Sequence, residues 1–388
     1  MNVGFYFHIP MSFAEGSARV PAHMGAFIDE LGRRAGKVTF YGHSQAPSDA
    51  EDFVLNAPHI SVVDLGPRRS APHRTFTGRR LVDEIDFSAD GVDVMLVRGP
   101  SPLLPWFGQV KQVPVAYYLQ SDYRTVSAAR WMPAWRRAAI ELWKIVYTRR
   151  QTRALTGAHV IVNSPELARG LEGKARKVYE VVSSLVRAED VVDVSARRQV
   201  RGFFHLAYAG RIVEEKGLLE LCTAVAELRS RGVKTTAALY GRPDDEAFEG
   251  LLLKQIERLG AMSLVQLKGY LPLPEVRSRF READCLVLPS YHEGFPHVVL
   301  DAMAAGLPVV ATRVGGLPHY LRDGIDAILI EPRSVSAIVQ AIELLAGDDD
   351  LRRRLALAGS DWVRQHTLER TCSAVIDILK SIRVRSKP

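Results

Sequence analysis

Short apolar runs alternate with longer segments of helical character along the whole chain, and this alternation restricts the fold more than any other feature. The runs predict strands at residues 3–8, 38–41, 92–97, 113–119, 159–162, 177–182, 204–209, 235–240, 264–267, 285–288, 309–311 and 327–330. Runs that are apolar throughout are typical of strands buried on both faces of a parallel sheet. The pattern therefore predicts an α/β protein with two doubly wound sheets.

The length of 388 residues exceeds that of one ordinary domain and favours two. We expect a first domain at 1–185, a polar linker at 186–200, a second domain at 201–365 and a C-terminal helix at 366–388. The region 43–90 is rich in Pro, Arg, Asp and Ser and is expected to form variable loops or short elements.

The composition limits where such a chain is expected to function. Hydrophobic residues make up 47%, and no uncharged apolar run reaches the roughly 18 residues of a membrane-spanning helix. The first residues carry no basic segment or cleavage site and read as a strand rather than a signal peptide. The cysteines, at positions 222, 285 and 372, are too far apart to form a metal-binding spacing. We expect a cytoplasmic protein with buried, reduced thiols.

The positive charge is concentrated in the first half of the chain. Residues 1–200 hold 26 Lys or Arg against 20 Asp or Glu, which is most of the formal net charge of +7. A basic half could meet nucleic acid, anionic lipid or a phosphorylated substrate. No segment resembles a nucleic-acid-binding module, so no nucleic-acid partner is expected.

Two acidic residues bracket a loop that joins a predicted buried strand to a helix. Glu293 lies in the loop, Pro296 suits the first helical position, and Asp301 follows within the helix. Free backbone N–H groups at such a junction form an anion site at the carboxyl edge of a parallel sheet. Carboxylates beside an anion repel it unless they bind hydroxyl groups of the same ligand. A sugar joined to a nucleoside diphosphate has this layout.

A second loop follows the predicted strand 204–209. Gly210 allows a tight turn, Arg211 and Lys216 supply positive charge, and Gly217 opens the next helix. Arg211 can bind two phosphate oxygens at once, whereas Lys216 acts as a compact point charge. The loop therefore suits a diphosphate. The simpler alternative is that both residues are ordinary surface charges.

The segment 289–312 resembles the signature of retaining glycosyltransferases of family 4, in which two glutamates are separated by seven residues. The resemblance covers roughly residues 200–382. It implies that Glu293 contacts the donor sugar and that Asp301, one methylene shorter than the usual Glu, holds the nucleotide ribose. The loop with Arg211 and Lys216 resembles the family's diphosphate-binding loop.

The resemblance also implies the GT-B fold, in which two doubly wound Rossmann-like domains face each other across a cleft and the last helix crosses back to the first domain. The donor-binding residues that it implies are Gly16, Gln120, Gly210, Gly241, Tyr270, Gly294, Phe295, Pro296, His297, Val298 and Asp301. Gln120 stands where the family often has a histidine. A glutamine can hydrogen-bond a sugar hydroxyl but does not titrate near neutral pH.

The predicted function is transfer of a sugar from a UDP- or GDP-linked donor to an acceptor hydroxyl with retention of configuration. Arg211, Lys216 and Glu293 are the candidate catalytic residues, with no cofactor and no metal. The run Asp348–Asp350 is interpreted as a turn and helix N-cap rather than a metal site. The acceptor is expected to be lipid-linked or a saccharide in bacterial envelope polysaccharide or glycolipid synthesis. The alternatives are a nucleotide-sugar epimerase and a non-catalytic sugar-nucleotide-binding protein.

Residues 130–153 combine three of the five tryptophans with many basic side chains. An amphipathic basic helix with tryptophans suits an anionic membrane surface. The alternative, a packed helix with a solvated basic face, has equal weight. The first interpretation would place the protein peripherally on the inner face of the cell membrane, with Trp131, Trp135 and Trp143 on one side of the helix.

Overall fold

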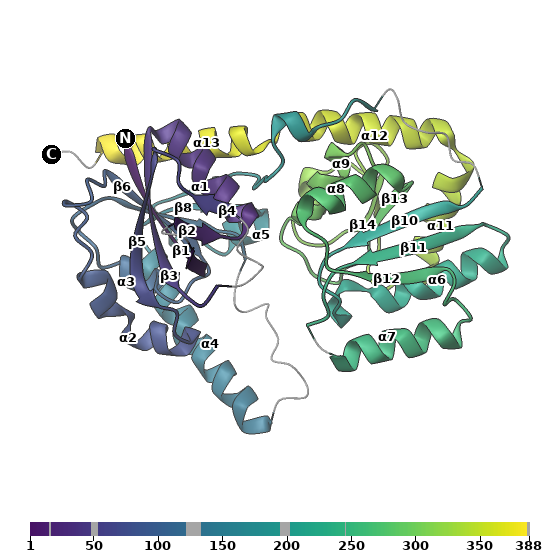
Figure 1. Ribbon diagram of the computed structural model, residues 1–388, viewed down its shortest axis with the longest axis horizontal. Helices are drawn as coiled ribbons and strands as arrows, with labels where there is room; N and C mark the ends of the chain where they lie inside the picture. The colour runs from purple at the N-terminus through teal and green to yellow at the C-terminus, as the bar shows by residue number, and fades with distance from the viewer. Residues whose placement is uncertain (15–16, 48–52, 122–132, 195–201, 245, 386–388) are drawn as a thin grey trace. The chain divides into compact units, whose positions relative to one another are not determined.

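The computed structural model describes residues 1–14, 17–47, 53–121, 133–194, 202–244 and 246–385 (Figure 1). The chain divides into two compact units. Unit 1 comprises Met1–Leu185 and Leu368–Pro388, and unit 2 comprises Val186–Thr367. The chain enters unit 2 at the start of the predicted linker. There, Ala188–Asp190 form a short 3-10 turn, and the Val192 N–H donates to the Ala304 carbonyl at 2.9 Å.

Unit 1 is built on a largely parallel sheet with the order β5-β3-β1-β6-β7-β8-β9. Its strands are β1 (Asn2–Ala14), β3 (Lys37–Ser44), β5 (Ile60–Pro67), β6 (Val94–Gly99), β7 (Val115–Leu119), β8 (His159–Val162) and β9 (Lys177–Glu180). The far end of β1 pairs antiparallel with β2 (Ser17–Val20), which in turn pairs with β4 (Phe53–Leu55).

The expectation of loops or short elements across residues 43–90 is wrong for two segments. β5 pairs with β3 at the edge of the sheet, and helix α2 covers Ala71–Asp83. Most β5 residues are only partly buried, so their sequence lacks the apolar run of an inner strand. Ser70 caps α2, because its hydroxyl accepts a hydrogen bond from the His73 N–H at 3.4 Å. This N-cap is a local sign of a helix that the polar composition of the region obscured.

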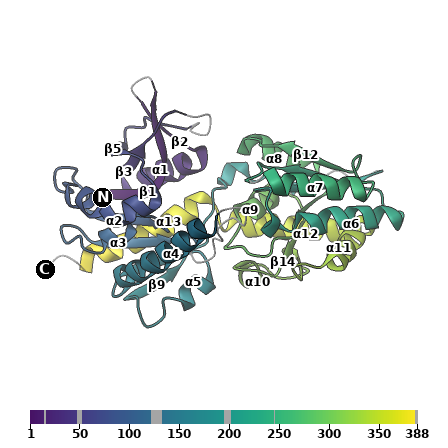
Figure 2. The ribbon, with the colours of Figure 1, turned by 90° about the horizontal axis from the view of Figure 1, so that it is seen from below.

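Helices cover both faces of the unit 1 sheet. They are α1 (Ala22–Ala35), α2, α3 (Leu104–Phe107), α4 (Ala134–Leu155), α5 (Pro165–Arg169) and α13 (Leu368–Arg385). Helix α13, although last in the chain, packs beside α1 (Figures 1 and 2). Neighbouring β1 residues point to opposite faces of the sheet. Phe5 packs with side chains of α1 and α13 on one face, and Tyr6 packs with side chains of α3 on the other.

Unit 2 contains a wholly parallel sheet with the order β12-β11-β10-β13-β14-β15. Its strands are β10 (Phe204–Ala209), β11 (Thr235–Tyr240), β12 (Val265–Gly269), β13 (Cys285–Leu288), β14 (Val309–Thr312) and β15 (Ile328–Ile330). The predicted strands of this half agree with these bounds to within two residues. The order reverses between β10 and β13, which is the topological switch point where open α/β sheets bind ligands.

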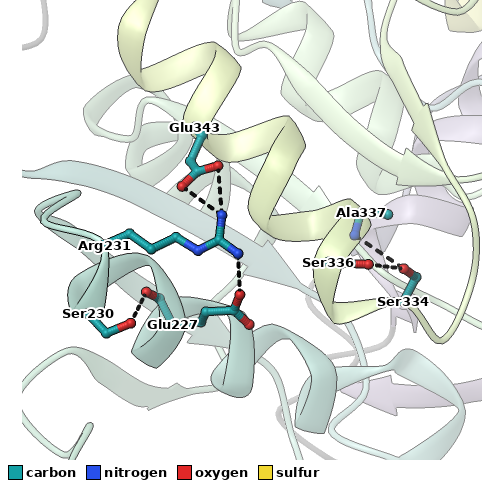
Figure 3. Close-up of polar contacts among 7 residues, drawn as sticks. All are labelled: Glu227, Ser230, Arg231, Ser334, Ser336, Ala337 and Glu343. Carbon is teal, nitrogen blue, oxygen red and sulfur yellow. Dashed lines mark hydrogen bonds and ion pairs between the residues drawn. The ribbon is translucent and has the colours of Figure 1, made fainter.

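Seven helices are described around this sheet. They are α6 (Leu218–Ser230), α7 (Glu246–Arg258), α8 (Leu273–Glu282), α9 (His297–Ala304), α10 (Leu317–Tyr320), α11 (Val335–Gly347) and α12 (Asp349–Arg364). At the end of α6, Arg231 reaches Glu227 at 2.6 Å and Glu343 of α11 at 3.2 Å (Figure 3). Ser334 caps α11 by accepting from the Ala337 N–H. The exposed ion pairs of Arg231 add little stability.

Asp348 caps α12, because its carboxylate accepts a hydrogen bond from the Leu351 N–H at 2.8 Å, as the sequence predicted. No helix in the described part of the chain combines the length and apolar character that crossing a bilayer requires.

Candidate functional site

The loops that leave β10 and β13 lie side by side at the switch point of the unit 2 sheet. Gly217 joins the β10 loop to α6 with φ of +67°, and a Cβ atom there would overlap the Pro289 carbonyl at the end of β13. The Tyr291 N–H donates to the Glu215 carbonyl at 2.8 Å, which joins the two loops directly. The sequence placed its candidate residues on these two loops, and the fold brings them together.

Lys216 and Glu293 form a partly buried ion pair between the two loops. The Lys216 Nζ lies 2.6 Å from the Glu293 Oε1, and the side chains are only 14% and 10% exposed. Charge-assisted hydrogen bonds of this kind are short and hold both groups in one geometry. The pair therefore places one cation and one carboxylate next to each other at the sheet edge.

Arg211 lies on the open side of the same loop. Its guanidinium donates to Asp244 at 2.8 Å and to Glu215 at 2.7 Å, and its side chain is 56% exposed. Tyr208, in β10, holds the backbone of this loop, because its hydroxyl donates to the Arg211 carbonyl at 2.7 Å. Such exposed ion pairs are weak, so the guanidinium can exchange partners when an anion arrives.

Two adjoining cavities meet at Arg211. The smaller has a volume of about 210 Å³ and is lined by Tyr208, Ala209, Gly210, Arg211, Lys216, Leu288, Glu293, Pro296, His297 and Val298. The larger has a volume of about 330 Å³, is mainly apolar, and is lined by Ala209, Gly210, Arg211, Tyr240, Gly241, Arg242, Asp244, Tyr270, Leu271 and Val276. A ligand with one polar and one flat apolar end would match this pair of cavities.

The loop from Glu293 to Pro296 is held from behind by a glycine pair. Gly315 has φ of +58°, and a Cβ atom there would overlap the Glu293 carbonyl. The Gly316 N–H donates to the Gly294 carbonyl at 2.7 Å. Phe295 is buried, with its ring 5.2 Å from Tyr320 and 5.6 Å from Trp362. Gly294 and Phe295 thus shape the loop without lining either cavity.

Helix α9 starts one residue later than the sequence suggested, with Pro296 as the N-cap and His297 as the first helical residue. His297 and Val298 line the smaller cavity. The first N–H groups of a helix have no carbonyl partner within it and favour negative charge nearby. The start of α9 is therefore suited to an anion in that cavity.

Asp301 lines neither cavity and is buried instead against helix α8. Arg277 contacts its Oδ1 at 2.8 Å and reaches Asp190 at 2.6 Å, with Asp301 6% exposed. Burial raises the pKa of Asp301, and Arg277 opposes that rise. Nothing in the sequence around Arg277 indicated this contact, because the partners come together only through the packing of α8 against α9.

In unit 1, Gln120 follows β7 and has both ends of its amide engaged. Its Oε1 accepts a hydrogen bond from Arg98, and its Nε2 donates to Ser183 at 2.6 Å. No pattern in the sequence indicated Arg98 or Ser183 as its partners. Gly16, the other candidate in this half, lies outside the described residues.

Helix α4 does not present its tryptophans as the sequence suggested. Trp135 is 68% exposed, but the Trp143 indole donates to Thr75 at 3.2 Å and packs against the buried Tyr147. The prediction that they share one side is wrong for Trp143, because a spacing of eight residues drifts around a helix of 3.6 residues per turn. Trp131 lies outside the described residues.

Comparison with known proteins finds sequence similarity in the second half of the chain. Residues 198–362 match the family model described as Glycosyl transferases group 1. A D-inositol 3-phosphate glycosyltransferase of Arthrobacter sp. (strain FB24) is 37% identical over 197 residues, which is 47% of this chain and 46% of that protein. A glycogen synthase of Mycobacterium tuberculosis is 30% identical over 164 residues, 42% of this chain and 39% of that protein. The matches therefore span less than half the length of these relatives.

Solved structures match the whole chain in fold. A sucrose-phosphate synthase from Thermosynechococcus elongatus has a TM-score of 0.73 at 17% identity, covering 99% of both chains. Anabaena HepE in complex with UDP-glucose has a TM-score of 0.72 at 17% identity, covering 98% of this chain and 100% of that one. At such identities the likeness shows the fold alone. It confirms the predicted α/β GT-B fold class.

Proposed function

We propose that this chain, whose residues 198–362 match the family model of glycosyl transferases group 1, transfers a sugar from a nucleoside diphosphate sugar to an acceptor hydroxyl. The observation that carries the proposal is the Lys216–Glu293 pair, which lies in a cavity at the switch point with Arg211 at its mouth. A cation for phosphate and a carboxylate for hydroxyls are the two groups that such a donor needs in adjacent positions.

The catalytic demand in this reaction is the negative charge that grows on the departing diphosphate. Lys216 and Arg211 would stabilise that charge, together with the N–H groups at the start of α9. Glu293 would accept hydrogen bonds from the donor sugar while Lys216 holds its carboxylate in place. In the proposed mechanism the leaving phosphate takes the acceptor proton on the same face, which retains the configuration without a protein nucleophile or a metal ion.

The larger, apolar cavity would hold the nucleoside. Arg242 lies over the Tyr270 ring, with 4.4 Å between its guanidinium carbon and the ring centroid, and this pair forms a flat wall for a base. Gly210 lines both cavities and Gly241 lines the larger one, so neither position adds a side chain there. HepE, which shares the fold, has been crystallised with UDP and with UDP-glucose, which supports a nucleotide-sugar donor here. The base would be uracil or guanine.

Asp301 would bind the ribose only by sharing its carboxylate with Arg277. Both contacts from Arg277 go to Oδ1, so a ribose hydroxyl would have to reach Oδ2. The acceptor would be lipid-linked or a saccharide, in envelope polysaccharide or glycolipid synthesis.

The exposed side of α4 would contact an anionic membrane surface. Trp135, Leu142 and Ile145 are 68%, 64% and 50% exposed, so these apolar side chains of α4 face solvent. Arg136, Arg137 and Arg149 lie on the same helix and could meet anionic headgroups. This contact would bring a cytoplasmic enzyme to the inner face of the cell membrane.

The test is donor turnover with and without acceptor. UDP- and GDP-sugars are incubated with the full chain, and both nucleoside diphosphate and sugar epimers are quantified. We expect acceptor-dependent release of nucleoside diphosphate and a product with the anomeric configuration of the donor. Interconversion of free donor sugars would instead support an epimerase, and donor binding without any turnover would support a non-catalytic protein.

A further inference from the structure

Arg333 holds a backbone conformation that residues with a side chain rarely adopt. It follows β15 and precedes Ser334, the N-cap of α11 (Figure 3), and its φ is +60°. It is the one non-glycine residue with a positive φ in the described part of the chain, where every other such position is a glycine. Chirality disfavours this left-handed conformation for any residue with a Cβ atom. A glycine would be less strained here, so the arginine calls for a physical reason.

The Arg333 side chain lies over the ring of Tyr291. The distance from its guanidinium carbon to the ring centroid is 4.2 Å, which is within the range of a cation–π interaction. Tyr291 belongs to the loop after β13, so the contact joins two loops that leave different strands of the unit 2 sheet. Strained backbone persists where its surroundings stabilise it, and it concentrates at functional sites. The contact with the Tyr291 ring offsets part of the strain at Arg333.

Tyr291 in turn holds the segment that leads into α6. Its N–H donates to the Glu215 carbonyl at 2.8 Å, and its hydroxyl donates to the Glu220 Oε1 at 2.6 Å. Glu215 is next to Lys216, and Glu220 lies in the first turn of α6. A hydrogen bond from a hydroxyl to a carboxylate is charge-assisted, and it is stronger than one between neutral groups. Tyr291 therefore fixes the β10 loop on both sides of its junction with α6.

The Glu220 carboxylate depends on this tyrosine. Its Oε2 is buried without a hydrogen-bond partner among the described residues, whereas Oε1 accepts from the Tyr291 hydroxyl. The start of α6 favours negative charge nearby, but a half-satisfied buried carboxylate is still unfavourable. Arg333 and Glu220 thus contact the same tyrosine, one at its ring and one at its hydroxyl. Strained backbone and an unsatisfied buried oxygen in one cluster favour a functional explanation over one of stability alone.

This cluster of Arg333, Tyr291 and Glu220 flanks the proposed donor site without entering it. Tyr291 lies two residues before Glu293 and is hydrogen-bonded to the residue before Lys216. None of the three is among the described residues that line the two cavities. The cluster can therefore act on the Lys216–Glu293 pair only by fixing the backbone from which the two side chains extend.

We propose that Arg333 and Tyr291 are positioning residues that hold the β10 and β13 loops in the geometry that sugar transfer requires. The strained conformation of Arg333 is the stability that the fold gives up to keep this geometry. A misplacement of about 1 Å caused far from the reacting atoms can lower a rate roughly a hundredfold. The effect on rate rests on the proposed transferase function, whereas the effect on the order of the loops does not depend on turnover.

Replacing Arg333 separates the rate of transfer from stability. Arg333→Gly removes the strain and the cation together, so we expect an equal or higher melting temperature and a kcat lower by roughly tenfold to a hundredfold. The KM for the donor should stay unchanged, because Arg333 lines neither cavity. Arg333→Lys keeps a cation near the ring and should lose less of kcat than Arg333→Gly.

Three results of this comparison would overturn the proposal. The first is an unchanged kcat in Arg333→Gly, and the second is an equal loss of kcat in Arg333→Gly and Arg333→Lys. The third is a fall of melting temperature together with kcat in Arg333→Gly, which would give the arginine an ordinary structural role.

Tyr291→Phe tests the other half of the cluster. It keeps the ring for Arg333 and removes the hydrogen bond to Glu220, so kcat should fall while the donor KM stays unchanged. Tyr179→Phe is the control, because it removes a hydroxyl that is hydrogen-bonded to His159 at 3.1 Å in unit 1. The same kcat in both variants would contradict the role of Tyr291.

Amide hydrogen exchange tests the positioning without turnover. In Arg333→Gly, peptides that cover residues 211–217 and 289–296 should exchange faster than in the unmodified protein, and peptides from α7 should not change. Unchanged exchange in both loops overturns the proposal. Donor turnover is measured on the same samples. If the unmodified protein transfers no sugar, the proposed function is lost, and hydrogen exchange alone decides this inference.

Discussion

Lys216 donates a 2.6 Å hydrogen bond to Glu293, although 77 positions separate the two residues in the chain. The pair forms because β10 and β13 are neighbours at the point where the sheet order reverses. Each partner lies on the loop after its strand, so the topology places both charges at the same edge. The arrangement keeps a cation and a carboxylate poised in one cavity, and it leads to the first two predictions.

Removing either cation of the diphosphate site should slow transfer. Arg211→Ala or Lys216→Ala is expected to lower kcat by roughly two to three orders of magnitude, because charge on the leaving diphosphate is then poorly stabilised. Nucleoside diphosphate release is the measurement, with Lys254→Ala on the exposed face of α7 as the control. Rates within a few fold of the unmodified enzyme in both variants would remove these residues from the mechanism.

Glu293→Gln should separate binding of the nucleotide from catalysis. The change frees Lys216 from its ion pair, so UDP or GDP should bind at least as tightly as before, while transfer falls because the amide no longer fixes the sugar hydroxyls in the same way. Calorimetry gives the nucleotide affinity, and a turnover assay gives kcat. Weaker nucleotide binding with unchanged kcat is the opposite result and would contradict the role of Glu293.

Transfer should not require a divalent metal. Lys216, Arg211 and the start of α9 already supply positive potential to the phosphate site, so an added cation is redundant there. Activity is expected to survive excess EDTA after dialysis. A complete loss of activity that Mg²⁺ or Mn²⁺ restores would mean that the side-chain charges are insufficient.

The Arg277–Asp301 pair should contribute to stability and to its pH dependence. Arg277→Gln leaves a buried carboxylate without its partner, with an expected loss of about 3 kcal/mol in unfolding free energy. The double variant with Asp301→Asn should recover most of it. Urea denaturation measures both, and an additive double variant would show that the two side chains do not interact.

The pH dependence of this pair has a definite sign. Burial raises the folded-state pKa of Asp301 above its unfolded value, so the folded state binds more protons, and this residue's contribution to stability falls as pH rises through that interval. Without Arg277 the rise is larger. The deficit of Arg277→Gln relative to the unmodified protein should therefore shrink as the pH is lowered towards 4. A deficit that grows on acidification would contradict this sign.

Membrane contact should depend on the exposed face of α4. The protein should co-sediment with vesicles that contain anionic lipid. The bound fraction should fall at high salt, because screening weakens the attraction between basic residues and the headgroups. Joint replacement of Trp135→Ala and Arg136→Glu should reduce binding, and Leu251→Ala with Arg258→Glu on α7 serves as the control. Equal recovery with neutral and anionic vesicles would return α4 to the role of an ordinary packed helix.

Inner strands such as Cys285–Leu288 were predictable because burial on both faces of the sheet favours an apolar run. The edge strand β5 was not predictable, because its side chains are only partly buried. It is placed by hydrogen bonding to β3, which no local pattern in the sequence shows. Helix α2 was missed for a related reason, since few of its residues enter the core.

The sequence by itself determined the two-sheet α/β plan and the two charged loops, because apolar periodicity and strand–loop–helix junctions are local properties of the chain. It marked Arg211, Lys216 and Glu293 as candidates without showing that Lys216 and Glu293 form a pair. Only the tertiary structure decided the partners: Arg277 for Asp301 and Arg98 for Gln120. The physical reason is that a buried charge or amide must be matched by whichever group the packing of distant elements brings within hydrogen-bond distance.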